Sequence, residues 1–209
     1  MPNNGSLWNS YRKGEQRKDF PNVAIFAKRA SLLFLQELFS QRPEGCLKYD
    51  SDDTKTEIQI SDQHTVNLDS VHVKPSIVAV RGPLSAQNMG LGGNGREGRN
   101  LVTGDRTYND LLVGSVAFSC YSREGIEAEN IAYIVFNSFK LYKPILREAG
   151  FFTIKSVNLG AEALVESGAE DELYMVPVYV TLQIQDRWKL TDQAARKIKE
   201  IIISCEKHL

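Results

Sequence analysis

The sequence predicts an α+β fold in which a mainly antiparallel sheet has two long helices packed on one face. Two segments, one after Pro21 and one after Ser122, repeat apolar residues with the period of a helix. Most of the chain around them alternates apolar and polar residues with the period of a strand. Strands that cluster between two long helices favour one helical layer on one sheet.

The first helix is expected in NVAIFAKRASLLFLQELFSQR. One helical face there is expected to carry Ile25, Ala30, Leu33 and Phe34, and it is widened by Phe26, Leu38 and Phe39. This apolar arc is broad enough to pack on a sheet and touch something else. Pro43 and Gly45 are typical helix-ending residues, so we expect the helix to stop before them.

Several segments with a period of two are expected to be strands. Three of them, EIQI, VNLDSVHV and SIVAVR, lie between Lys55 and Arg81. The segment LLVGSVAFSCYSR would place Leu112, Val116, Phe118 and Cys120 toward a core. Two further strands, FFTIKSVNLG and MVPVYVTLQIQDRWKL, flank the acidic segment AEALVESGAEDE, which we expect to be a loop.

The second helix is expected in SREGIEAENIAYIVFNSFKLYKPILREAG. Ser122 is a suitable cap, and its buried stripe is expected to comprise Ile131, Ile134, Val135, Phe139 and Tyr142. Pro144 should end or kink this helix. The last segment, TDQAARKIKEIIISCEKHL, is expected to form a C-terminal helix.

The domain organisation predicted is a flexible N-terminal arm over residues 1–20 and a single α+β domain over residues 21–209. The arm is polar, with Trp8 and Tyr11 as isolated aromatic residues. A long glycine-rich inter-strand loop at about residues 82–106 is expected as an insertion between two strands. Loops of that length in compact domains are usually functional or disordered.

Composition narrows the function classes. The chain has 209 residues, 24% of them charged, and a net charge of −1, which is typical of a soluble globular protein and argues against a polyanionic partner. The N-terminus lacks the apolar core of a signal peptide and no apolar run is long enough for a membrane span, so we expect assembly inside a cell. Cys46, Cys120 and Cys205 have no CxxC spacing, so neither a disulfide framework nor a zinc site is expected.

The stretch NMGLGGNGREGRN contains Gly90, Gly92 and Gly95 with the spacing of a dinucleotide-binding turn. That turn must leave a strand directly and open a helix, whose N-terminal amides hold the phosphate. The nearest strand ends well before Gly90, and no apolar helical stripe follows Gly95. We therefore interpret the glycines as part of the loop and predict no nucleotide cofactor.

Catalytic patterns are weak. No G-x-S-x-G motif is present, and the only candidate bases are His64, His72 and His208, of which His72 is expected on the solvated face of a strand. The string YDSDDTK places Asp53 two residues before Lys55, as in some metal-dependent nucleases, but a charged turn before a strand explains it better. The chain is therefore not expected to be an enzyme, and no catalytic, cofactor-binding or metal-binding residue is predicted.

Charge is unevenly distributed along the chain. Arginines outnumber acids in residues 81–106, and residues 161–172 carry acids with no basic residue. Basic and acidic regions on a nearly neutral chain favour contact between copies or with a partner, although an ordinary mixed surface is the alternative. The candidate assembly residues are Trp8, Tyr11, Arg96, Arg99, Arg106, Glu162, Glu166, Glu170, Asp171 and Glu172.

The order of elements and two segments resemble the tail terminator and related neck proteins of tailed bacteriophages. The segments are DLLVGSVAFSCYSREGIEAENIAYIVFNSF, a strand with a G-x-V step that runs into a helix rich in small and acidic residues, and MVPVYVTLQIQDRW, a closing strand ending at Trp188. The resemblance covers about residues 21–190. The N-terminal arm, the glycine-rich loop and the basic C-terminal helix depart from it.

The resemblance implies a structural virion protein that forms a homo-hexameric ring on top of the tail tube and joins it to the head-completion or neck proteins. It implies that DNA passes through the lumen without sequence-specific binding, and that the ring assembles in the host cytoplasm without a membrane or cofactor. Residues 162–172 would then form a lumen or ring-to-ring surface. Another neck, adaptor or baseplate protein of similar fold is the alternative, and a metal-dependent nuclease is a further one.

Overall fold

The computed structural model of the 209-residue chain describes residues 23–62, 74–87, 95–99, 106–148, 150–166 and 172–190. The chain divides into two compact units. The first unit comprises Met1–Leu84 and Val113–Ile184, and the second comprises Ser85–Leu112 and Gln185–Leu209. Each unit is described separately below. The N-terminal arm over residues 1–20 and the C-terminal helix expected from residue 191 lie outside the described residues, and the single domain over 21–209 stays a prediction.

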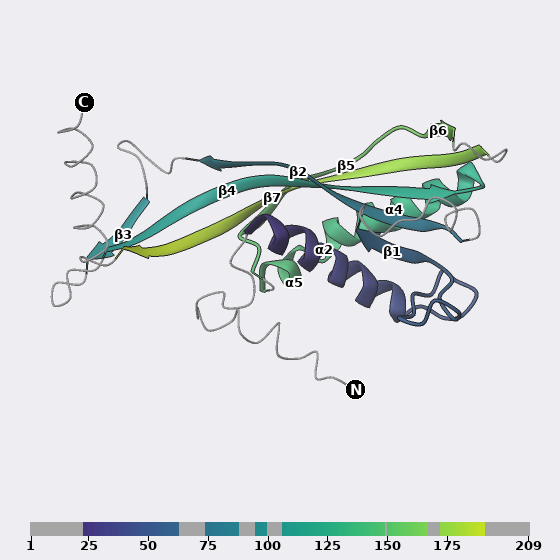
Figure 1. Cartoon of the computed structure of the whole chain (residues 1–209), viewed down its shortest axis with the longest axis horizontal. Coiled ribbons are helices and arrows are strands. Elements are labelled where there is room, and N and C mark those ends of the chain that lie inside the picture. The colour runs from purple at the N-terminus through teal and green to yellow at the C-terminus, as the bar shows by residue number, and fades with distance from the viewer. Residues whose placement is uncertain are drawn as a thin grey trace, which may run out of the picture. The chain divides into compact units, whose positions relative to one another are not determined.

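The α+β class is confirmed, with a mixed sheet and few helices (Figure 1). The elements are α2 (Val23–Ser40), β1 (Gln59–Asp62), β2 (Ser76–Gln87), β3 (Gly95–Arg99), β4 (Arg106–Ser122), α4 (Gly125–Leu141), α5 (Lys143–Glu148), β5 (Thr153–Leu159), β6 (Ala163–Glu166) and β7 (Glu172–Leu190). The seven-stranded sheet has the order β1-β2-β4-β7-β5, with β3 paired to β4 and β6 paired to β7.

The sheet is mixed because β1 runs parallel to β2, whereas β3 is antiparallel to β4, and β5 and β6 are antiparallel to β7. A parallel pair requires a crossover connection between its strands. Residues 63–75 make that connection, and the strand expected in VNLDSVHV falls among residues 63–73, outside the described residues. The sequence pattern predicted strands here, but it carried no information on their direction.

The core of the first unit is aromatic. The ring of Phe139 in α4 lies 5.0 Å from the ring of Phe118 in β4 and 5.3 Å from that of Phe34 in α2, measured between centroids. The ring of Phe26, also in α2, lies 5.5 Å from that of Phe151. Offset aromatic pairs of this kind stabilise a core beyond the area they bury. These contacts join both long helices to each other and to the sheet.

The face that α2 buries differs in part from the predicted one. Phe26, Phe34 and Phe39 are buried as expected. Ile25 is 51% exposed and Leu33 is 37% exposed, whereas Leu35, outside the predicted arc, is buried. The apolar arc of α2 is broad, so periodicity alone left several orientations open. The aromatic contacts of Phe26 and Phe34 select the one that is found.

The alternation predicted for the two long strands is confirmed only over part of each. Leu112, predicted to face the core, is only half-buried while its neighbour Leu111 is buried, and Gln183 is buried between Leu182 and Ile184. In β4, Val116, Phe118 and Cys120 are at most 1% exposed, and the residues between them are only half-buried. In β7, Val180 and Leu182 are likewise buried, while Tyr179 is 46% exposed. One face of these strands therefore meets the core.

The second helix is confirmed, and Ile131, Val135 and Phe139 lie on its buried face. The prediction was wrong for Ile134, which is only half-buried, and for Tyr142, which follows the helix and is 39% exposed. It ends at Leu141, and the unpredicted short helix α5 follows with Pro144 in its first turn. Proline is tolerated in a first turn because its missing N–H would have no partner there.

The edge formed by β5 and β6 is bent opposite a proline. Three residues, Gly160 to Glu162, face two residues of β7, Val176 and Pro177, so the edge strand has an extra residue at that point. Pro177 offers no N–H, and its carbonyl oxygen accepts a hydrogen bond of 2.7 Å from the Gly160 N–H. A β-carbon on Gly160 would lie 2.6 Å from Pro177 Cγ, so a side chain would overlap the proline ring. The expectation of an acidic loop was therefore wrong at β6, which begins directly after the bend.

In the second unit, the expectation of one loop over residues 82–106 was wrong in its boundaries. Strand β2 continues to Gln87, and Gly95–Arg99 forms β3, which pairs with the start of β4. The register shifts between Arg96 and Gly98, a position where glycine relieves the crowding of a bulge. A strand, not a helix, thus contains Gly95, and the strand-turn-helix frame of a dinucleotide site does not follow this glycine.

Candidate functional site

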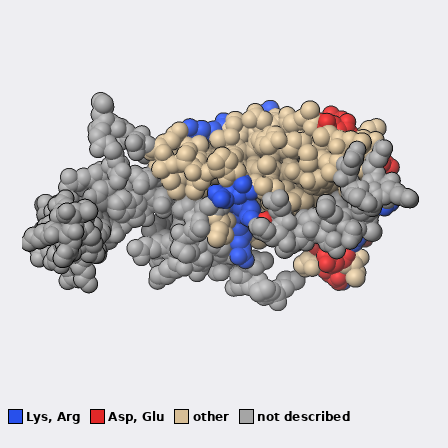
Figure 2. Space-filling model, turned by 45° about the horizontal axis from the view of Figure 1, so that its top comes forward, with Lys and Arg blue, Asp and Glu red and all other residues tan. Residues whose placement is uncertain are grey.

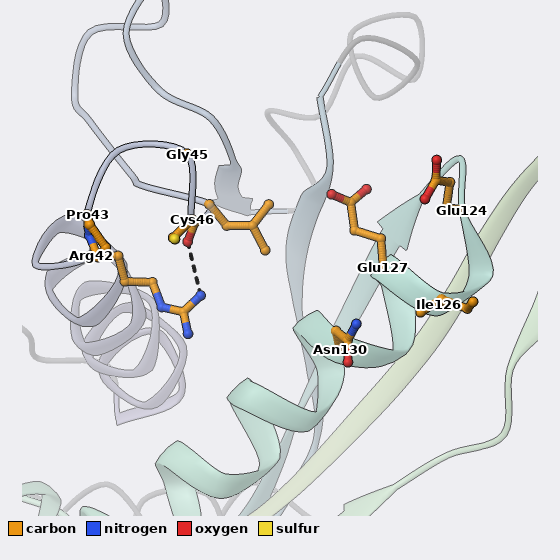
Figure 3. A pocket seen from close by; sticks show the side chains of 9 residues that line it. Arg42, Pro43, Gly45, Cys46, Glu124, Ile126, Glu127 and Asn130 are labelled. Atoms are coloured by element: carbon orange, nitrogen blue, oxygen red, sulfur yellow. Dashed lines mark hydrogen bonds between the residues drawn. The ribbon is translucent and has the colours of Figure 1, made fainter.

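An open pocket of about 550 Å³ in the first unit lies between the chain that follows α2 and the first turns of α4 (Figure 3). We call it the α2–α4 pocket. Its lining residues are Arg42, Pro43, Gly45, Cys46, Leu47, Glu124, Ile126, Glu127 and Asn130. Residues 42–47 form the loop wall, and residues 124–130 form the helix wall.

The loop wall is held by its own hydrogen bonds. The Arg42 guanidinium donates a hydrogen bond of 3.1 Å to the Cys46 carbonyl oxygen and lies 5.1 Å from the centroid of the Phe39 ring. The backbone is left-handed at Gly45, with φ of 79°, and at Leu47, with φ of 63°. Leucine rarely adopts that conformation, so surrounding contacts must hold the loop in this shape.

Glu57 supplies the strongest of those contacts. Its carboxylate accepts hydrogen bonds of 2.6 Å from the Gly45 N–H and 2.9 Å from the Lys48 N–H. These two donors hold the pKa of Glu57 below its ordinary value. The amides of this loop therefore already have an anionic partner from within the chain.

The turn that contains Asp53 and Lys55 also uses its polar groups internally. Asp50 and Asp52 accept hydrogen bonds from backbone N–H groups two residues further on, at 2.9 and 3.0 Å, and the bonds from Thr54 lower the pKa of Asp52. This geometry is that of a capped turn. Within the described part of the chain, no three His, Cys, Asp or Glu side chains form a group that could hold a metal ion.

The helix wall begins at a second hydrogen-bonded corner. Glu124 is the N-cap of α4, and its N–H donates a hydrogen bond of 3.2 Å to Ser122 Oγ, while the Ser122 hydroxyl donates to the Glu127 carboxylate. The cap predicted at Ser122 was therefore wrong: the N-cap is Glu124, and Ser122 supports the helix start from two residues earlier. Figure 3 shows the Glu124 and Glu127 side chains rising from this corner. Ile126, between them, is 77% exposed.

The polar groups of the pocket are a guanidinium, two carboxylates, an amide and the exposed thiol of Cys46. The other described thiol, Cys120, is buried, and desolvation raises its pKa far above the ordinary value. His64, His72 and His208 lie outside the described residues.

The acidic candidate residues fall at one hairpin of the first unit. Glu166 ends β6 and Glu172 begins β7, and the two are register partners. Glu162 is exposed at the bend before β6, with its carboxylate beside Gly125 at the start of α4. We call β6 with the start of β7 the acidic hairpin. Glu170 and Asp171 lie outside the described residues.

The basic candidate residues fall at one hairpin of the second unit. Arg99 ends β3 and Arg106 begins β4, and they too are register partners, while Arg96 is opposite Tyr108. We call β3 with the start of β4 the basic hairpin. Trp8 and Tyr11 lie outside the described residues.

The structure thus pairs arginine with arginine and glutamate with glutamate, and the sequence could not show this because strand register depends on the turns between strands. The pocket was also missed. Pro43 and Gly45 were interpreted only as the end of a helix, and Glu124 and Glu127 lie more than 70 residues further along the chain. Only the folding of α2 beside α4 brings them together.

Comparisons with known proteins do not supply a family. A scan against protein-family models found no model that matches the chain, and a search of curated proteins found no relative. In the described residues, no helix is long and apolar enough to cross a membrane.

Proposed function

We propose that this chain is a structural subunit of a tailed bacteriophage, a tail terminator that forms a hexameric ring on the tail tube and joins it to the neck. The observation that carries the proposal is the like-charge register of the two hairpins, Arg99 with Arg106 and Glu166 with Glu172. The resemblance in sequence supplies the family.

Like charges that face each other across an antiparallel pair destabilise it by roughly 0.2–1 kcal/mol. A hairpin that carries such a pair gains stability when opposite charge approaches from another molecule. One hairpin here is basic and the other is acidic. A closed ring of identical subunits needs two different, complementary edges, and these hairpins supply edges of opposite sign.

The fold is consistent with a ring subunit. We propose that the two long helices form one layer that supports one face of a mainly antiparallel sheet, which leaves hairpins and strand edges for contacts between copies. The alternation of buried and half-buried residues in β4 favours this two-layer arrangement.

Charge also fits a channel for DNA. A wall past which DNA slides should not offer a continuous basic surface, because that surface would bind DNA through counterion release. On the face shown in Figure 2, most of the described surface is uncharged. We propose that DNA passes without sequence-specific contacts, that no cofactor is needed, and that the partners are the tail tube and the head-completion proteins of the virion.

Negative-stain imaging of the purified protein, alone and with tail tubes, tests the ring. We expect rings that cap one end of the tubes. Rings that do not bind tail tubes would favour another neck, adaptor or baseplate protein. A protein that never forms rings would contradict the proposal.

Charge reversal tests the hairpins. The pair Arg99→Glu with Arg106→Glu should prevent ring formation, as should the pair Glu166→Lys with Glu172→Lys. All four changes in one chain should restore rings, because opposite charges then meet again across the edge. The matched control is Lys155→Glu, an exposed residue of β5 outside both hairpins, which should form rings normally. Failure of the fourfold variant in a folded protein would remove the hairpins from the contact.

A further inference from the structure

The outward face of α4 carries large apolar side chains that the described part of the chain does not cover. Ile126 is 77% exposed, Tyr133 56% and Leu141 70%. They are separated by seven and eight residues, which is about two helical turns each, so they form one stripe along the helix. The opposite face of the same helix packs into the core through Ile131, Val135 and Phe139.

Charges on this helix are divided between its ends. Glu124, Glu127 and Glu129 lie at its start, and Lys140 and Lys143 lie at its end or directly after it. Such a distribution suits the helix dipole, but it also makes the surface self-complementary. A second helix that runs in the opposite direction would place its basic end against this acidic end, and the reverse.

The spacing of the stripe matches the same arrangement. Ile126 lies seven residues before Tyr133 and Leu141 lies eight after it, while Asn130 lies three before and Asn137 four after. A two-fold axis close to Tyr133 therefore brings each isoleucine to a leucine of the other copy and each Asn130 to an asparagine.

The charged residues fit that axis as well. Glu129 of one copy and Lys140 of the other would lie within about 3 Å of each other along the helix axis, at a rise of about 1.5 Å per residue. The Lys140 ammonium lies 5.9 Å from the Phe136 ring centroid, and that ring stacks on Tyr133 at 6.4 Å. The basic group is thus held next to the residue at the centre of the stripe.

We propose that the outward face of α4 binds the same face of a second copy in an antiparallel, two-fold contact. Ile126 and Leu141 form its apolar ends, Tyr133 its centre, and Glu129 with Lys140 its charged flank. The contact also brings the basic end of the second helix toward Glu124 and Glu127 of the α2–α4 pocket, where two carboxylates surround the exposed Ile126.

This contact does not rest on the ring. In a two-fold contact both copies use the same surface, whereas ring neighbours use two different surfaces. The two contacts therefore respond to different substitutions. A helix pair buries less surface than a standard interface of about 800 Å² per partner, so we expect a dimer that dissociates on dilution.

Sedimentation velocity of the full chain over a range of concentrations tests the contact. Lys140→Glu alone and Glu129→Lys alone should each weaken the dimer about tenfold, because like charges then meet twice across the axis. The double variant with Glu129→Lys and Lys140→Glu should restore the wild-type dissociation constant. In a two-fold contact, residue 129 of each copy meets residue 140 of the other, so the two changes together place opposite charges in contact again. Circular dichroism of each variant checks that α4 is intact.

Cross-linking tests the position of the axis. Tyr133→Cys places two thiols near the axis, so mild oxidation should give a covalent dimer. Wild type, which contains Cys46, and the exposed control Lys155→Cys should cross-link much more slowly. Equal cross-linking rates for Tyr133→Cys and Lys155→Cys would overturn the proposal. A wild-type protein that stays monomeric at all concentrations would also overturn it, as would a double charge variant whose dimer is as weak as those of the single variants.

Imaging of the same variants separates this proposal from the ring. If Lys140→Glu no longer dimerises but still forms rings, the dimer and the ring use two distinct contacts. Dimers without rings in wild type would contradict the proposed function and leave the α4 contact standing. Loss of rings and dimers together in Lys140→Glu would assign α4 to the ring contact and overturn the two-fold assignment.

Discussion

The two walls of the α2–α4 pocket are built in different ways. In the loop wall, polar groups bond within the chain: Arg42 to the Cys46 carbonyl, and Glu57 to the amides of Gly45 and Lys48. The helix wall is anchored from its far side by the buried Phe139, and its pocket side presents Ile126, 77% exposed. The polar groups of the loop wall therefore hold the loop in its shape, while the helix wall presents an exposed apolar side chain to the pocket, although its Glu127 also accepts a hydrogen bond within the chain from Ser122.

The two walls should affect the stability of the protein differently. Because the loop wall is held by hydrogen bonds to a carboxylate and by left-handed backbone, its contribution to stability should depend on pH and fall when Gly45 gains a β-carbon. A wall held by aromatic packing should respond to loss of core volume and be nearly indifferent to pH. Substitutions on the two walls should consequently change the free energy of unfolding by different amounts and in different directions.

The largest effect is expected at the anchor of the helix wall. Phe139→Ala removes a ring that is 1% exposed and contacts both Phe34 and Phe118, so the free energy of unfolding should fall by about 3–5 kcal/mol. The matched control is Tyr133→Ala on the outward face of the same helix, which should change it by less than about 0.5 kcal/mol at concentrations too low for dimers. Urea unfolding measures both, and similar losses would mean that the two faces of α4 are not distinct.

A smaller loss is expected in the loop wall. A β-carbon on Gly45 would meet no atom within 4 Å, but the backbone φ of 79° is unfavourable for any residue with a side chain. Gly45→Ala should therefore lower the free energy of unfolding by about 1–2 kcal/mol through backbone conformation alone. Gly45→Asn is the control, because asparagine tolerates left-handed backbone better and should lose less. An unchanged Gly45→Ala protein would show that the loop adopts another conformation without cost.

Sequence reasoning predicted the anchor of the helix wall and missed the loop wall, for physical reasons. Val135 and Phe139 belong to a helical stripe, and Phe118 belongs to an alternating strand, so local periodicity indicated that each would be buried. Glu57 is held by amides nine to twelve residues away, through a loop whose shape depends on the left-handed backbone of Leu47, an uncommon state for leucine. No periodic pattern encodes such a contact.

The pairing of residues across the two hairpins could not be predicted from the sequence either. The acidic and basic segments were visible in the sequence, but the opposition of Arg99 to Arg106 and of Glu166 to Glu172 depends on register. The segment expected to be one acidic loop contains a bend at Gly160, opposite Pro177, and then the strand β6. The sequence analysis missed this strand.

The pH dependence of stability should originate in the loop wall. The pKa of Glu57 is lowered by the Gly45 and Lys48 amides, so its stabilising effect is complete above the ordinary value of 4.5 and is lost as pH falls through the lower pKa of the folded state. Glu57→Gln should flatten the fall in the urea midpoint below about pH 4.5, whereas Phe139→Ala should lower the midpoint and keep the slope. Asp52 contributes in the same direction, so some slope should remain in Glu57→Gln. An unchanged slope would assign the acid sensitivity to other carboxyls.

The smallest effect, and one of opposite sign, is expected at the glycine of the helix wall. Gly125 opens α4, and a β-carbon there would overlap only the end of the flexible Glu162 side chain, with Oε1 at 2.2 Å. Because Glu162 is exposed and can rotate away, Gly125→Ala should raise the free energy of unfolding by about 0.5 kcal/mol through helix propensity and a less flexible unfolded chain. The double variant Gly125→Ala with Glu162→Ala should gain at least as much, since no side chain then needs to move. A loss in Gly125→Ala that Glu162→Ala reproduces on its own would mean that the Glu162 carboxylate stabilises the start of α4. In that case the helix wall, like the loop wall, would depend on an internal carboxylate, and the contrast between the two walls would not hold at this corner.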